Sequence, residues 1–141
     1  MRSDLTGMSE NPVDDKGRVS LPSIFRKSLS DETLVLAKSN DPEFPHLRLY
    51  AQGDYDAWIE RYFESDGGFK DNLLDHQRKL AALKRGAKPV KIDASYRIRI
   101  ESDLRDYAVI TDKVRFNGVN DHVMIIAPEI DDKYDDFVSL Y

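Results

Sequence analysis

Residues 14 to 26 read DDKGRVSLPSIFR, and residues 93 to 105 read DASYRIRIESDLR. Each stretch combines a charged turn, a short run of alternating polar and apolar residues typical of a half-buried strand, and the start of a helix. An offset of 79 residues superposes the two stretches and places Asp14 on Asp93. The chain therefore contains an internal duplication, which predicts two units of similar structure.

The duplication extends over the rest of both halves. Each half is predicted to contain a strand, a turn, a second strand, a short helix, a hairpin of two strands and a final helix. Neither half is large enough to bury its apolar face alone, so we expect the two to pack together about a pseudo-twofold axis. The same offset matches an aromatic helical stripe to a C-terminal one, placing Tyr55, Trp58, Ile59 and Tyr62 on Tyr134, Phe137, Val138 and Tyr141.

A separate helix is predicted between the halves, over residues 71 to 85, where leucines recur at helical spacing before Gly86. The hairpin of the second half is marked by Asn117-Gly118, a dipeptide typical of tight turns. The expected organisation is a first unit over residues 5–62, a connecting helical segment over 63–87 and a second unit over 88–141.

The composition narrows the class of protein. There is no cysteine, which excludes disulfides and sulfur-ligated metals. The first twenty residues contain no apolar run, so we expect no signal peptide, no transmembrane span and a cytoplasmic protein. The net charge of -5 argues against a protein that coats nucleic acid by being basic throughout. Charge is nevertheless segregated, with eight Lys and Arg against one Asp in residues 78–99 and five Asp and Glu against one Lys in residues 129–141.

Catalytic and metal-binding patterns are missing from the sequence. The three histidines, His46, His76 and His122, lie in unrelated segments without the i, i+4 spacing that favours a shared metal ion. Neither a G-x-S-x-G nucleophile elbow nor a phosphate-binding glycine loop occurs. We therefore predict no catalytic residue, no metal, no cofactor and no small-molecule substrate.

The two D-x-x-x-R motifs, which begin at Asp14 and Asp93, are the strongest candidates for a functional site. An isolated motif of this kind most often braces a turn with an exposed ion pair. Duplication in the same strand and helix context favours a function, because a guanidinium presented by a turn can fork onto O6 and N7 of guanine or bind phosphate. Four further cations are candidates for phosphate contacts: Arg26, Lys27, Arg99 and Arg105.

These motifs resemble the MraZ family of bacterial regulators, which are built from two fused AbrB-like units. The resemblance covers nearly the full length of the chain. It implies an α+β, β-rich fold of tandem duplicated swapped-hairpin β-barrel units of the SpoVT-AbrB type, with short helices and a pseudo-twofold axis within one chain. The residues that carry it are DDKGRVSLPSIFR, DASYRIRIESDLRDYA, Leu5-Thr6-Gly7 and the aromatic helix containing Tyr55 and Trp58.

The resemblance also implies a function. Members of the family are sequence-specific transcriptional regulators that bind double-stranded DNA at repeated G-rich boxes in the promoter of the division and cell-wall gene cluster. They assemble into homo-oligomeric rings and associate with the nucleoid in the cytoplasm. By motif position, the implied DNA-binding residues are Asp14, Lys16, Arg18, Asp93 and Arg97.

The second motif departs from the family pattern at its fourth position. Tyr96 stands where the pattern has a glycine before the arginine. Because an aromatic residue takes a positive φ only at a cost, we expect the second turn to differ in shape from the first.

Two other functions stay open on the sequence. One is an AbrB-like assembly or antitoxin-type module that mainly binds a protein partner, through the acidic C-terminal end and exposed aromatic residues. The other is a small enzyme, which a cleft holding several ionisable residues of perturbed pKa would indicate. A DNA mobility shift with and without Arg18 would separate a DNA-binding regulator from the protein-binding module.

Overall fold

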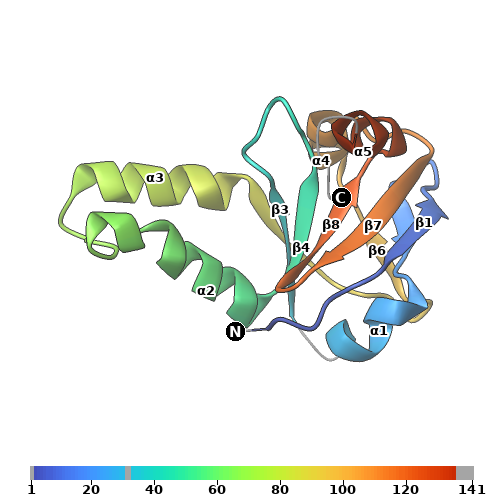
Figure 1. The fold of residues 1–141 in the computed structure, drawn as a ribbon, viewed down its shortest axis with the longest axis horizontal. Coiled ribbons are helices and arrows are strands. Elements are labelled where there is room, and N and C mark those ends of the chain that lie inside the picture. Colours follow the sequence, from blue (N-terminus) through green and yellow to red (C-terminus); the bar gives the residue numbers. More distant parts are fainter. Residues whose placement is uncertain (1, 31–32, 136–141) are drawn as a thin grey trace.

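The computed structural model describes residues 2–30 and 33–135, which form an α+β fold around an antiparallel six-stranded sheet and a two-stranded ribbon (Figure 1). The expected order of elements recurs in both halves, and the helix predicted between them begins at Leu74. The strands are β1 (Met8–Pro12), β2 (Arg18–Ser20), β3 (Leu34–Lys38), β4 (Leu47–Ala51), β5 (Ala87–Val90), β6 (Arg97–Arg99), β7 (Lys113–Val119) and β8 (His122–Ile126). The helices are α1 (Ser23–Leu29), α2 (Gln52–Tyr62), the 3-10 turn η1 (Glu64–Asp66), α3 (Leu74–Arg85), α4 (Ser102–Ala108) and α5 (Pro128–Asp135).

The six-stranded sheet interleaves strands from the two halves. Its order is β1-β7-β8-β4-β3-β5, so β1 of the first half pairs with β7 of the second, and β5 of the second half pairs with β3 of the first. The strands β1, β3 and β4 of the first half correspond to β5, β7 and β8 of the second. Exchanging each strand for its counterpart gives the same order read from the opposite edge of the sheet. The strand order is therefore symmetric about β4 and β8, which pair with each other at the centre of the sheet.

The ribbon of β2 and β6 lies against the core through one face. Val19 and Ile98 are directly opposite each other and are both buried. The alternation that buries Val19 turns Arg18 and Ser20 outward, so the other face of the ribbon is polar. The ribbon, α1, α4 and one face of the sheet enclose a single core, which includes Leu21, Phe25, Leu36, Leu104, Phe116 and Ile125.

The segment from α2 to α3, residues 52–85, forms a helical arm that projects away from the sheet (Figure 1). At its base Tyr55 and Trp58 pack on Tyr50 of β4, with ring centroids 5.7 and 6.4 Å away. Farther along the arm, Phe63 and His76 are buried and their ring centroids lie 5.1 Å apart. Several large apolar side chains of the arm are nonetheless exposed to solvent: Tyr62, Phe69, Leu73 and Leu74.

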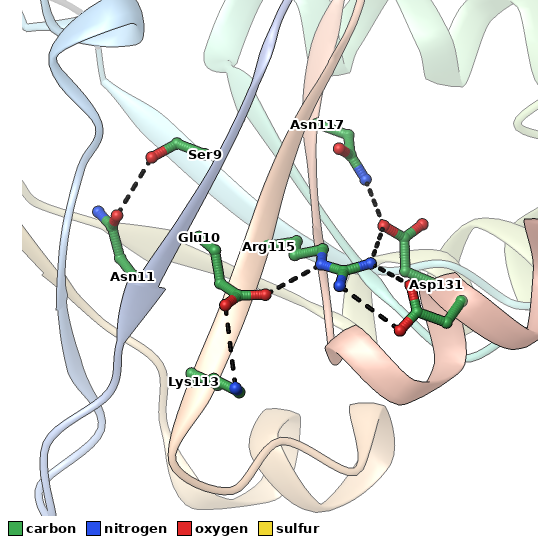
Figure 2. Close-up of polar contacts among 8 residues, drawn as sticks. Ser9, Glu10, Asn11, Lys113, Arg115, Asn117 and Asp131 are labelled. Atoms are coloured by element: carbon green, nitrogen blue, oxygen red, sulfur yellow. Dashed lines mark hydrogen bonds and ion pairs between the residues drawn. The ribbon is translucent and has the colours of Figure 1, made fainter.

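Ion pairs hold α5 on the sheet (Figure 2). Nη1 of Arg115, on β7, donates to Asp132 at 2.6 Å and to Asp131 at 3.3 Å. Nε of Arg115 donates to Glu10 on β1 at 3.0 Å, and the Asn117 side chain donates to Asp131 at 3.4 Å. Asp132 first, and then Glu10, raise the pKa of Arg115 further above its ordinary value. Helix α5 is therefore tied to β7, and the same arginine joins β7 to β1 of the first half.

The Asn117-Gly118 dipeptide does not form the turn of the second hairpin, so this prediction is wrong. Both residues lie inside β7, and the chain reverses at residues 120–121. Gly118 is required instead by a close approach of distant backbone, because a Cβ there would lie 2.4 Å from the amide nitrogen of Thr6.

The offset of 79 residues does not extend through both halves. It relates β2 to β6 and α1 to α4, but Ala51 and Ala127, which precede α2 and α5, are 76 positions apart. The hairpin loop spans residues 39–46 in the first half and residues 120–121 in the second, so the later elements fall out of the earlier register. The aromatic stripe of α2 therefore does not match the C-terminal helix in the predicted way. Three residues of that match lie outside the described residues: Phe137, Val138 and Tyr141.

Candidate nucleic-acid interface

The first turn, residues 14–18, is closed by the side chain of Asp14. Its Oδ1 accepts the backbone N–H groups of Lys16 and Arg18, at 2.9 and 2.8 Å, and its Oδ2 accepts the Nε–H of Arg18 at 2.7 Å. These hydrogen bonds, led by the one from the Arg18 amide, lower the pKa of Asp14 to about 2. Asp14 is therefore ionised at neutral pH and fixes the direction of the Arg18 guanidinium.

The second turn, residues 93–97, repeats this geometry. Asp93 accepts the backbone N–H groups of Ser95 and Arg97, at 2.8 and 2.9 Å, and the Nε–H of Arg97 at 2.9 Å. The hydrogen bond from the Arg97 amide is the largest of the effects that lower the pKa of Asp93. Each turn thus presents an arginine that its own aspartate holds through Nε.

Tyr96 adopts the backbone conformation of the glycine it replaces, and the prediction that the second turn differs in shape is wrong. Its φ is 58°, and that of Gly17 in the first turn is 83°. The Tyr96 amide donates to the Asp93 carbonyl at 3.0 Å, and the Tyr96 carbonyl accepts the amide of Leu21 at 2.8 Å. Hydrogen bonds on both sides therefore hold the residue in a region that costs an aromatic residue free energy.

The ribbon brings the two turns together on one exposed surface. Arg18 lies directly opposite Arg99, and Ser20 lies opposite Arg97. Opposite residues of an antiparallel pair point to the same face, so three guanidinium groups gather on the outer face of the ribbon. Nε of Arg99 donates to the carbonyl of Lys16 at 3.2 Å. Arg99, predicted as a candidate for a phosphate contact, therefore stands beside Arg18.

The outer edges of Arg18 and Arg97 face solvent. Within residues 2–30 and 33–135, both side chains form hydrogen bonds and ion pairs through Nε alone, to Asp14 and Asp93. The two side chains are 37% and 36% exposed. Nη1 and Nη2 of each guanidinium can therefore reach a ligand while the carboxylate behind holds the group in place.

The arginines of the two short helices lie against the turn of the opposite half. The Arg26 guanidinium, on α1, is 4.8 Å from the ring centroid of Tyr96, and its Nε donates to the Leu21 carbonyl at 2.8 Å. Arg105, on α4, lies beside Gly17, where a Cβ would come within 3.0 Å of the Arg105 Cζ. Nε of Arg105 is buried and has no hydrogen-bond partner among the described residues. Both arginines therefore help to build the turns, whereas a purely phosphate-binding side chain would extend into solvent.

Lys16 and Lys27 are exposed, one in the first turn and one on α1. Sequence reasoning included both, but it did not assign a role to Tyr96, which is 45% exposed at the apex of the second turn. The signal for Tyr96 was available, because it occupies the position of Gly17 in the duplicated motif.

Two other kinds of functional feature, a metal site and a membrane-spanning helix, are absent from the described residues. Within residues 2–30 and 33–135, no group of three or more His, Cys, Asp or Glu side chains could hold a metal ion. No helix in those ranges is long and apolar enough to cross a membrane. Burial lowers the pKa of His46, to about 4, and that of His122, and both side chains are enclosed in the interior.

Three proteins of similar sequence share one name. Over 132 residues the chain is 34% identical to the transcriptional regulator MraZ of Caldanaerobacter subterraneus subsp. tengcongensis, covering 92% of this chain and 85% of that protein. It is 32% identical to the protein of the same name from Phocaeicola vulgatus, with 90% and 81% covered. It is 31% identical to that of Gluconacetobacter diazotrophicus, with 86% and 77% covered. No family model matches the chain.

Proposed function

The chain belongs to the MraZ family of transcriptional regulators, and on this premise we propose that it is a sequence-specific regulator that binds double-stranded DNA through its two D-x-x-x-R turns. Its targets are repeated short boxes in the promoter of the bacterial division and cell-wall gene cluster. It works in the cytoplasm, associated with the nucleoid.

One observation carries the proposal. Arg18 and Arg97 emerge from turns of equal geometry, and an aspartate pins each of them through Nε. The remaining Nη1 and Nη2 atoms form the fork that matches O6 and N7 of guanine in the major groove. Asp14 and Asp93 are therefore positioning residues, because they restrict the direction of the fork. Arg99 and the exposed Lys16 and Lys27 supply charge for the phosphates that flank the bases, and Arg26 and Arg105 stand behind the turns.

The interleaved strands support a further proposal about the architecture. The units over residues 5–62 and 88–141 are two AbrB-like swapped-hairpin units that close together as one barrel, with residues 63–87 as the connecting helical segment. The exchange of β1 and β5 between the halves, and the pairing of β2 with β6, are the features that support this assignment.

We propose that the protein acts as a homo-oligomeric ring. The helical arm exposes Tyr62, Phe69, Leu73 and Leu74 to solvent. The last turn of α3, at the base of the arm (Figure 1), is basic, whereas α5 is acidic, so the surface carries two unlike patches. Unlike patches join subunits head to tail, and such contacts close into a ring when the rotation between subunits allows it. A ring presents several reading surfaces to DNA at once, which multiplies weak contacts into useful avidity.

The alternative function, an antitoxin-type module that mainly binds a protein partner, draws on the same exposed arm. Its other support was the acidic C-terminal end. Two carboxylates of that end, Asp131 and Asp132, are already bound by Arg115 (Figure 2). These two carboxylates therefore serve the fold, and the exposed arm is the stronger of the two features that favour a protein partner. An enzymatic activity, a cofactor and a small-molecule substrate form no part of the proposal.

The experiment that tests the function compares two single variants with the wild type. Duplexes are enriched from random-sequence DNA by the wild-type protein, and affinities for the enriched and a scrambled sequence are measured over a range of salt. Arg18→Ala should cost roughly 1–3 kcal/mol on the enriched sequence and relax the preference at one base pair. Lys27→Ala should weaken both sequences alike and reduce the salt slope by about one.

Thermal unfolding of both variants provides the control for folding. If the wild type enriches no sequence, or if Arg18→Ala weakens the enriched and scrambled duplexes equally, the turns do not read DNA. The protein-binding alternative then takes its place.

A further inference from the structure

The two turns share a backbone but carry different side chains at their apex. Gly17 and Tyr96 occupy the same position in the duplicated motif, and their carbonyls make matching hydrogen bonds to the amides of Ile100 and Leu21, both at 2.8 Å. Gly17 is buried, whereas Tyr96 is 45% exposed. The pseudo-twofold symmetry of the fold therefore breaks at the surface that faces DNA.

The folded state does not require a tyrosine at this apex. A positive φ suits glycine, and an aromatic residue in that conformation is destabilising. The hydrogen bonds that hold Tyr96 use its backbone N–H and carbonyl, which a glycine would supply equally. An exposed aromatic side chain at a strained position is therefore better explained by what its ring contacts outside the protein than by stability.

Arg26 supports the ring from inside. Its guanidinium lies 4.8 Å from the ring centroid of Tyr96, a cation–π distance, and its Nε is anchored to the Leu21 carbonyl at 2.8 Å. The ring is thus held on one side by a cation that the protein itself fixes. The remaining surface of the ring faces solvent next to Arg97 in the same turn.

The chemistry around the ring indicates what it can bind. Its neighbour on the outer face, Arg97, is cationic and suits guanine edges and phosphates. A tyrosine ring adds apolar surface, and the apolar group that the major groove offers is the 5-methyl of thymine. The first turn cannot supply the same contact, because a Cβ at Gly17 would lie 2.3 Å from the backbone oxygen of Ile100.

We propose that Tyr96, positioned by Arg26, is a specificity-determining residue that contacts the 5-methyl group of a thymine next to the base that Arg97 reads. This inference rests on the proposed DNA-binding function and deepens it. The second turn then prefers a guanine–thymine pair of neighbours, while the first turn reads guanine without a thymine contact. One chain consequently binds its DNA in a single orientation, although its fold is nearly symmetric.

The test removes one methyl group from the DNA. The probe is the duplex enriched by the wild-type protein, prepared in a series in which deoxyuridine replaces one thymidine at a time. The wild type should lose about fourfold in affinity at one thymine, the effect of one methyl group withdrawn from a contact. Tyr96→Gly should bind the thymine and uracil versions of that duplex equally, and Tyr96→Phe should still distinguish them, because the contact needs the ring and not the hydroxyl.

Glycine suits the backbone at this position, so Tyr96→Gly is expected to fold, and its thermal unfolding verifies this. The inference is overturned if no thymine is sensitive to the loss of its methyl group, or if Tyr96→Gly keeps the sensitivity of the wild type. In both cases Arg18→Ala still weakens the enriched duplex, so the proposed function survives. A wild-type protein that enriches no sequence overturns the function and this inference together.

Discussion

Val19 and Ile98 lie directly opposite each other in the ribbon, and each is only 1% exposed. Val19 belongs to the first half of the chain and Ile98 to the second, so the surface that carries both turns is made by one strand from each half. Neither arginine that reads DNA in our proposal can be placed by its own half alone. The pair of Val19 and Ile98 therefore stabilises the fold and also holds the two turns of the candidate site next to each other.

Removing the side chain of Ile98 should destabilise the whole molecule. Ile98→Ala leaves a cavity in the core that the two halves share and should lower the free energy of unfolding by about 2–5 kcal/mol. Urea unfolding followed by circular dichroism and by fluorescence of Trp58, the sole tryptophan, should give one coincident transition. Ile24→Ala, at a side chain that is 54% exposed, is the matched control and should change stability by about 0.5 kcal/mol or less. Two separate transitions would contradict the shared core.

The first turn should not tolerate a side chain at its apex. Gly17→Ala forces a φ of 83° on alanine and places its Cβ 2.3 Å from the Ile100 carbonyl oxygen. We expect a loss of at least about 2 kcal/mol in the free energy of unfolding. The control is Gly53→Ala, because Gly53 lies in α2 with nothing within 4 Å of an added Cβ. That variant should gain about 0.5–1 kcal/mol, and equal effects of the two substitutions would refute the close-approach argument.

Acid should weaken the fold through His46. Its Nδ1–H donates to the Phe44 carbonyl at 2.9 Å and its Nε2 accepts from Nε of Arg48 at 3.3 Å, so only the neutral ring fits. Burial is the main cause that lowers its pKa from 6.5 to about 4. The folded-state pKa lies below the unfolded one, so this stabilisation is complete above about pH 6.5 and is lost as the pH falls towards 4.

The expected loss over that window is on the order of 2–3 kcal/mol. Urea unfolding at pH 7, 5.5 and 4.5 measures it, and His46→Gln should show a flatter dependence. An unchanged slope in that variant would place the acid sensitivity elsewhere, for example at His122, whose pKa burial also lowers.

The ion pairs around Arg115 should contribute more to the free energy of unfolding than isolated surface ion pairs do. Arg115→Gln removes hydrogen bonds to Glu10, Asp131 and Asp132, and it should reduce stability by about 1–3 kcal/mol, less at high salt. Lys113→Gln is the control, because Lys113 is half exposed and, among the residues that the structure describes, its ion pair is the one with Glu10 at 3.9 Å. Its effect should stay within about 0.5 kcal/mol. Hydrogen exchange in α5 should accelerate in the first variant alone.

The helical arm should govern assembly. Leu74→Glu puts a charge on a side chain that is 65% exposed, so the fold should persist while contacts between subunits weaken. Sedimentation should show wild-type protein as an oligomer and the variant as smaller species. On promoter fragments with one, two and four boxes, wild-type affinity should rise steeply with box number, and that of Leu74→Glu should not. Met8→Gln, at a side chain that is 61% exposed on β1, is the control. A monomeric wild-type protein would remove the ring from the proposal.

Local patterns in the sequence were enough to predict the order of elements and the position of the first turn. The alternation around Val19 and the charged turn before it act over a few positions, and such signals can be read along a single chain. Asn117-Gly118 misled because its role depends on Thr6, more than a hundred positions away. No rule about neighbours in sequence can report that contact.

The same limit applies to the candidate site. The motif placed Arg18 and Arg97 correctly in equivalent turns, but it did not reveal that Arg26 reaches across to the turn of the other half. It also suggested that Tyr96 would distort the second turn. Tertiary hydrogen bonds, including the one from Leu21, overrode this residue's preference.

The interleaving of the sheet also constrains how the chain can be made. Met8 of β1 pairs with Asn117 of β7, so the partner of the first strand leaves the ribosome about a hundred residues after it. At ordinary rates of synthesis this interval is on the order of ten seconds. The apolar strand β4 lacks its partner β8 throughout it, and β3 lacks β5 until residues 87–90 have been made. We therefore expect that the first half does not fold until strands of the second half have been made. A ribosome stalled just after residue 85 should carry a chain that proteases still cut freely.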